Sequence, residues 1–168
     1  MLHSEVLNEP YGDMRSFAKF ILLVVLLNLI RYLVGGPLEA ITIIERMHEV
    51  IPKYPDVFNN DFDTTDFMIS LFYNFMFWLT ATWVFHIAHP RVTGSFIVKS
   101  FKIFGLMCLF FVSVAAVYMN HYTDAVKPFY FYSMIDALIV FPIVALANGL
   151  IYPRLFKQEI GASEGLST

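Results

Sequence analysis

The stretch of residues 67–88 contains no Lys, Arg, Asp or Glu and is apolar almost throughout. A helix needs roughly 20 mainly apolar residues to cross the hydrocarbon of a bilayer. Three more stretches meet or approach this requirement, at about residues 17–34, 103–119 and 129–152. The chain carries 15% charged residues, whereas soluble domains carry about 25%. The sequence therefore predicts an all-α integral membrane protein, a four-helix bundle that forms a single domain over residues 1–168.

Orientation follows from Lys and Arg, which are retained on the cytoplasmic side of membrane spans. One side receives seven of them: Arg15, Lys19, Arg91, Lys99, Lys102, Arg154 and Lys157. The other side receives four basic residues: Arg31, Arg46, Lys53 and Lys127. Eight acidic residues also fall on that side. We therefore expect both termini on the cytoplasmic side of an inner (cytoplasmic) membrane. The net charge of −3 and the scattered basic residues argue against a nucleic-acid partner.

The outer loop between the first two spans is long enough to hold a helix of its own. Gly35 and Gly36 are expected to end the first span, and Pro37 suits the first turn of a new helix. Residues 37–52 then repeat apolar side chains at helical spacing, with charged residues on the other faces. They predict a short amphipathic helix that lies on the outer membrane surface or caps the bundle. Its apolar positions are Leu38, Ile41, Ile44, Met47 and Ile51.

Five polar residues fall at one depth in the outer half of the predicted spans: Asn28, Arg31, Asn74, Ser113 and Asp136. Polar groups in a bilayer usually face the interior of a bundle, where partners satisfy them. Asp136 can pair with Arg31, the only cation within reach on this topology. Alternatively, Arg31 extends to the lipid headgroups, and a neutral Asp136 hydrogen-bonds to Asn74. The sequence leaves both arrangements open.

A second group of polar residues is expected above this layer: Glu45, His48, Asp66, His121 and Asp124. Glu45 and His48 have the spacing that places a carboxylate and an imidazole on one helical face, as in di-iron bundles. Only one such motif occurs, so a single metal ion is the largest site that these residues could build. Solvated loop residues and helix caps explain the same pattern without a metal.

Histidine also occurs at the inner end of the second span, where His86 and His89 face the same way. The helix dipole favours cations at such an end, which explains them without a ligand. Haem held by two histidines needs ligands at matching depth on facing helices. His121 falls at the opposite face and His3 in the tail, so the sequence argues against haem and implies no other cofactor strongly.

Small residues and a proline predict where the last two spans pack and bend. Ala145 and Gly149 form a small-xxx-small pair, and Gly105 offers a similar close approach on the third span. Pro142 is expected to kink the fourth span about a turn and a half from Asp136. A kink beside a buried acid is found in gates, and also in helices that merely bend.

Three functions remain compatible with the sequence. The first is a non-catalytic subunit or assembly partner of a larger membrane complex, because there is no complete catalytic motif. The second is a homo-oligomeric channel, or a proton- or cation-coupled transporter that uses Asp136. The third is a membrane metal-binding or redox enzyme that uses the outer His and carboxylate residues. All three imply the lipid bilayer as surroundings, and the first two imply further subunits or copies of the chain.

Overall fold

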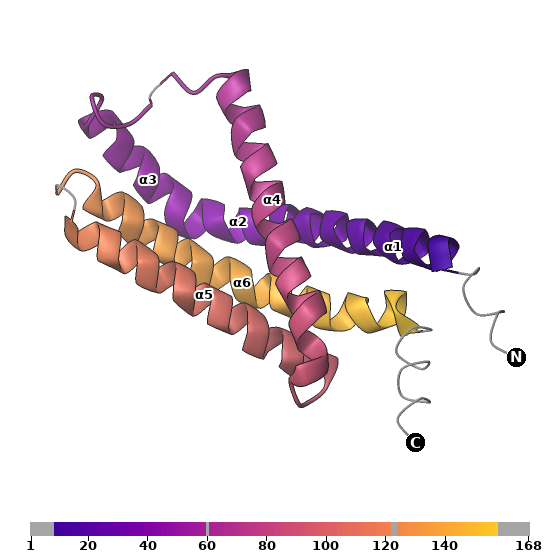
Figure 1. Cartoon of the computed structure of the whole chain (residues 1–168). Coiled ribbons are helices and arrows are strands. Elements are labelled where there is room, and N and C mark those ends of the chain that lie inside the picture. Colours follow the sequence, from indigo (N-terminus) through magenta and orange to yellow (C-terminus); the bar gives the residue numbers. More distant parts are fainter. Residues whose placement is uncertain (1–8, 60, 122–123, 158–168) are drawn as a thin grey trace, which may run out of the picture.

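The computed structural model describes residues 9–59, 61–121 and 124–157, and every regular element in these ranges is helical (Figure 1). Within them, four helical stretches are long and apolar enough to cross a membrane, which confirms the predicted number of spans. The stretches are Met14–Lys53, Thr64–Arg91, Phe96–His121 and Lys127–Leu155. All four extend beyond the predicted apolar runs, because a helix satisfies its backbone groups whether lipid or water surrounds it.

The first span does not end at Gly35 and Gly36, contrary to the prediction. Both glycines have right-handed helical dihedrals, with φ −67° and ψ −47° at Gly35 and φ −54° and ψ −48° at Gly36. Residues 37–52 are helical, but they continue the first span instead of forming a separate helix. Packing on α6 (Lys127–Leu155) holds them there, and Ile43 is only 2% exposed. The successive segments are α1 (Glu9–Ile30), η1 (Arg31–Gly35), α2 (Gly36–Glu39), η2 (Ala40–Ile44), α3 (Glu45–Val50) and η3 (Ile51–Lys53).

Two π-helical turns, η1 and η2, flank the short segment α2 that ends at Glu39. In η1 the Gly36 N–H donates to the Arg31 carbonyl, one residue farther back than in an α-helix. This wider turn lies where the Pro37 ring would otherwise meet a backbone carbonyl. It also changes which side chains share a face. At about 100° per residue, Glu39 would lie about 80° from Arg31 in a regular helix, and one extra residue in the turn brings this to about 20°.

The last two spans, α5 (Phe96–His121) and α6, lie side by side and antiparallel (Figure 1). Gly149 brings their backbones together, because a Cβ on it would lie 2.6 Å from the Cα of Ile97. Ala145, one turn earlier, is buried. The close approach predicted at Gly105 is not seen, since nothing lies within 4 Å of a Cβ built there. Pro142 lies inside α6 with its ring on the exposed face.

The second span, α4 (Thr64–Ala88), crosses the other helices instead of running alongside them (Figure 1). It begins with a capping box in which Asp63 and Asp66 each accept from the other's backbone N–H. Its second half is packed, with Trp78 and Phe85 buried, whereas its first half is largely exposed. The continuation of the first helix packs on the N-terminal half of α6 and occupies the space beside it (Figure 1). The arrangement thus departs from a parallel-sided four-helix bundle.

Candidate functional site

A cavity of about 180 Å³ lies where the first helix, α4 and α6 meet. Three polar residues that the sequence placed at one depth, Arg31, Asn74 and Asp136, line it together. The rest of the wall is apolar and mostly aromatic: Phe77, Trp78, Phe111, Ala137, Val140 and Phe141. We call this hollow the Asp136 cavity. It joins charged groups to an aromatic wall within the part of the chain that is apolar enough to cross a membrane.

Arg31 pairs with Glu39, and not with Asp136 as one of the two predicted arrangements had it. The Arg31 Nη2 atom donates to Glu39 Oε2 at 3.1 Å, and the two side chains are 14% and 10% exposed. The guanidinium carbon also lies 4.6 Å from the centre of the Tyr32 ring, a cation–π contact. Sequence reasoning missed Glu39, because the first span was predicted to end at Gly35. Glu39 was therefore assigned to a separate surface helix. The signal available was Pro37, which requires a distortion of any helix that runs through it.

Asp136 lies beside this ion pair. Its carboxyl group lies near the Glu39 carboxyl, and the charge of Arg31 acts on both. Among the described residues, Glu39 Oε1 has no hydrogen-bond donor although the atom is buried. Gly35 makes room for this atom, since a Cβ there would lie 3.3 Å from it. Two carboxyl groups therefore lie near one guanidinium in a largely buried site, and only Glu39 is paired with it.

Asn74 supplies a further polar atom to the Asp136 cavity. Its Oδ1 is buried and finds no donor among the described residues. Asn28 lies elsewhere, because its Nδ2 donates to the Val24 carbonyl at 2.9 Å and its side chain lines a different, apolar cavity of about 450 Å³ between α1 and α4. Ser113 is exposed and donates to the Leu109 carbonyl of its own helix at 2.7 Å. Of the five residues predicted to share a layer, Arg31, Asn74 and Asp136 meet at the cavity, whereas Asn28 and Ser113 do not line it.

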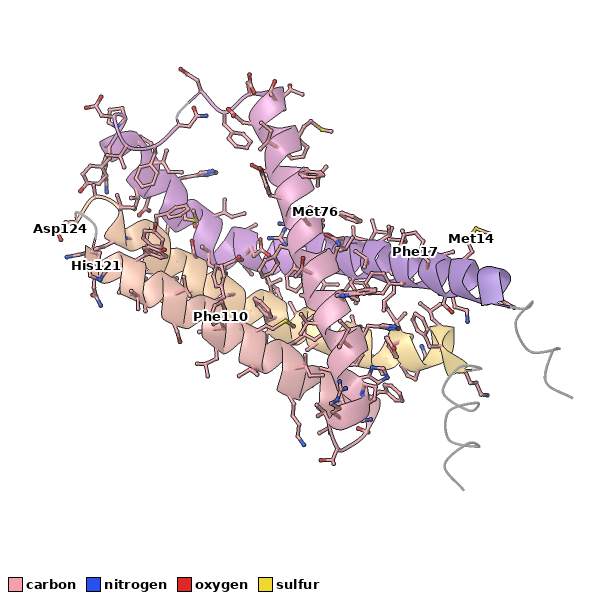
Figure 2. The ribbon with its side chains drawn as sticks, in the orientation of Figure 1. Met14, Phe17, Met76, Phe110, His121 and Asp124 are labelled. Atoms are coloured by element: carbon pink, nitrogen blue, oxygen red, sulfur yellow. The ribbon has the colours of Figure 1, made fainter. Side chains whose placement is uncertain are left out.

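The structure does not bring three of the proposed metal ligands together. Within the described ranges, no group of three or more His, Cys, Asp or Glu residues could hold a metal ion, so Glu45 and His48 gain no third partner. His121 and Asp124 lie at the turn between α5 and α6 (Figure 2), whereas Asp66 caps α4 and accepts from Asn59 Nδ2 at 2.8 Å.

Asp124 pairs with Lys127 across this turn. The Lys127 Nζ atom donates to Asp124 Oδ1 at 2.7 Å, and this hydrogen bond, with the lysine charge, lowers the pKa of the Asp124 carboxyl. A carboxyl whose pKa is lower in the folded state adds stability above its unfolded pKa, about 3.9, and loses it as the pH falls through the folded value.

We expect Lys127→Gln to raise the Asp124 pKa toward that of an unpaired aspartate, because both the hydrogen bond and the charge are removed. A carboxyl-carbon NMR titration of Asp124 measures the change. Arg46→Gln, which removes a cation from another exposed pair, is the matched control and should leave the Asp124 titration where it was. An unchanged midpoint in Lys127→Gln would show that the pair does not persist in solution.

His86 and His89, at the opposite end of α4, pack against α6 through Tyr152. The Tyr152 hydroxyl and His86 Nδ1 share a hydrogen bond of 2.8 Å, and His89 Nδ1 lies 2.9 Å from the His86 carbonyl. Tyr152 is 2% exposed, so it is a core residue and not the interfacial aromatic residue that its position suggests. The rings of Phe85 and Phe156 complete the contact, at 5.0 Å and 4.5 Å from the Tyr152 ring. This cluster ties the ends of α4 and α6 together.

The Asp136 cavity therefore holds ionisable groups in an apolar setting. Comparison of the chain with models of protein families, with curated proteins and with solved structures finds no match to any of them.

Proposed function

We propose that the protein translocates protons, as a channel or a proton-coupled transporter, through a site formed by Asp136, Glu39 and Arg31. One observation supports this above the others: the carboxyl groups of Asp136 and Glu39 lie near each other and near a single guanidinium, which is paired with Glu39. Like charges so close cannot both be ionised at low cost, and only one of them is balanced by the cation. The arrangement is neutral when it holds one proton.

The surroundings suit a group that gains and loses that proton. The cavity gives the site space beside Asp136, and most of its wall is apolar and aromatic. Ionisable residues within membrane spans commonly mark proton relays and ion paths. Glu39 also lies between two π turns, a distortion that is frequent at functional sites.

The rest of the proposal concerns assembly and orientation. Four helices enclose little space along their axis, so a complete path needs several copies of this chain. The distribution of Lys and Arg supports an inner membrane location with both termini on the cytoplasmic side.

Proton flux into vesicles tests the proposal. Purified protein is reconstituted into liposomes that contain a pH-sensitive dye, and a potassium gradient with valinomycin makes the lumen negative. We expect the lumen to acidify faster than in vesicles without protein. Asp136→Asn should reduce the rate to that of protein-free vesicles, because the amide cannot release or accept the proton.

Glu49→Gln is the matched control, since it removes one acid from an exposed pair outside the cavity and should leave the flux unchanged. The melting midpoint of Asp136→Asn, measured in the same detergent, separates a lost proton site from lost folding. Flux equal to the protein-free rate with the unaltered chain, or flux unaffected by Asp136→Asn in a folded protein, would contradict the proposal.

A second function, as a non-catalytic subunit of a larger membrane complex, is favoured by the first half of α4. This segment lies off the other helices (Figure 1), and Phe67, Phe72 and Tyr73 are 55%, 57% and 67% exposed on it. Aromatic side chains bury a large area on contact, so this exposed face suits an interface with another chain. The flux assay separates the two functions, since a subunit without its complex is expected to give no flux.

A further inference from the structure

The wall of the Asp136 cavity is an array of aromatic rings in mutual contact. Phe77, Trp78 and Phe141 lie with ring centres 5.1 to 5.8 Å apart. Phe111 of α5 stands 6.3 Å from Phe77 and extends the array. Aromatic rings attract a cation that lies over their faces, and the attraction grows when water is excluded. The wall is therefore chemically suited to a positively charged guest with an apolar body.

The charge of the site agrees with such a guest. The guanidinium of Arg31 is held by Glu39 at 3.1 Å and by the face of Tyr32. One acid is thus matched, and the carboxyl of Asp136 is left as the unmatched negative group when it is ionised. Any cation can balance it. A proton does so in the function proposed above, and an ammonium group would do so equally.

Hydrogen bonding narrows the class to amines that carry N–H groups. Asn74 Oδ1 is a buried acceptor without a donor among the described residues, and both Asn74 and Asp136 line the cavity. A protonated primary amine has three donors, so it can serve the Asp136 carboxylate and Asn74 Oδ1 at once. A quaternary ammonium has none and would leave Asn74 Oδ1 without a partner.

The volume limits the size of the guest. The cavity measures about 180 Å³, and an engineered cavity of about 150 Å³ in another protein holds benzene. There is room for one ring, or an aliphatic body of the same bulk, together with an aminomethyl group.

From these observations we propose that the Asp136 cavity binds a small protonated amine with an apolar body of about the size of a benzene ring. This inference rests on the proposed function, because the amine takes the carboxylate that otherwise carries the proton. The ammonium pairs with Asp136, its N–H groups reach Asn74, and the apolar body lies on the aromatic wall. The charged groups that face Asp136 from the packed elements are Arg31 and Glu39, and these remain paired with each other. Entry of one ammonium then releases one proton from Asp136, so that binding of the amine is coupled to movement of the proton.

Benzylamine is the probe, with benzyl alcohol and benzoate as neutral and anionic molecules of the same shape. The chain contains two tryptophans, so a Trp83→Phe background leaves Trp78, in the cavity wall, as the sole tryptophan, which can be excited selectively over the tyrosines. We expect benzylamine to change the Trp78 emission in a saturable way and to release protons in weakly buffered solution. Benzyl alcohol and benzoate should do neither.

Substitutions in the same background identify the groups involved. Asp136→Asn should abolish saturable binding, and Asn74→Leu should weaken it by about 10- to 150-fold, the cost of one hydrogen bond to a charged group. Glu49→Gln should bind as the background does. Equal binding of benzyl alcohol and benzylamine by the background protein would overturn the inference. This comparison uses the background protein alone, so it does not depend on whether a cavity variant folds.

The two proposals fail in different ways. If flux depends on Asp136 but benzylamine does not bind, the amine inference is wrong and the proton site stands. If benzylamine binds through Asp136 but no flux is found, proton translocation is wrong and the cavity is an amine-binding site.

Discussion

Arg31→Met is expected to lower the free energy of unfolding by about 3–5 kcal/mol, because it removes one partner of a buried ion pair and leaves the other charge without compensation. Glu39 would keep its carboxyl in a site where Oε1 already has no donor among the described residues. Unfolding of the purified protein in mixed micelles, followed by circular dichroism, measures the loss. In the double variant Arg31→Met with Glu39→Leu, most of the loss should be recovered, since neither charge remains buried.

Arg46 and Glu49 provide the matched control for this experiment. They form an ion pair at 3.3 Å on the same long helix, with side chains 61% and 52% exposed. Solvent screens such a pair, so Arg46→Met should change the stability by less than about 1 kcal/mol. Equal losses for Arg31→Met and Arg46→Met would mean that burial does not distinguish the two pairs, and the site described above would lose its structural basis.

Gly149→Ala is the second substitution with a large expected effect. The added Cβ would lie 2.6 Å from the Ile97 Cα and 3.1 Å from the Ile97 backbone nitrogen. These are main-chain atoms, so α5 and α6 must move apart along a contact that buries much of the core. We expect a loss of about 2–3 kcal/mol, the upper part of the range for overpacked interiors, measured as a fall in the thermal midpoint in detergent.

Gly105→Ala is the same chemical change on the neighbouring helix. Nothing lies within 4 Å of a Cβ built at Gly105, so only the better helix propensity of alanine acts, worth up to about 1 kcal/mol. The midpoint should stay constant or rise. A common response of the two glycines would show that helix propensity, and not the contact at Ile97, governs both positions.

The sequence was sufficient for the number and the rough limits of the spans, because these depend on long apolar runs. It was not sufficient at Gly35 and Gly36. Two glycines before a proline indicate a helix end when judged locally, but the contact of the following segment with α6 outweighs that local preference. A π turn then accommodates Pro37 without a break. Nothing in the local sequence states how strong a contact with a distant helix will be.

Contacts between distant segments also explain which residues of the site the sequence predicted and which it missed. Counting depth along the spans puts Arg31, Asn74 and Asp136 at one level, and these three line one cavity. Depth says nothing about the direction in which a side chain points, and Ser113 points away. Glu39 could not be placed without the π turn, because its face depends on one extra residue in the helix. The steep crossing of α4 is likewise a result of packing between segments far apart in the chain.

The continuity of the first helix has a mechanical consequence. At about 1.5 Å per residue, its 40-residue stretch Met14–Lys53 measures roughly 60 Å, twice the hydrocarbon thickness of about 30 Å. A large part of it must therefore lie outside the hydrocarbon, including the polar end that carries Arg46 and Glu49. That end is joined to Glu39 by helix without an intervening loop. We therefore expect a displacement of that end to move Glu39 as well, because no loop separates the two.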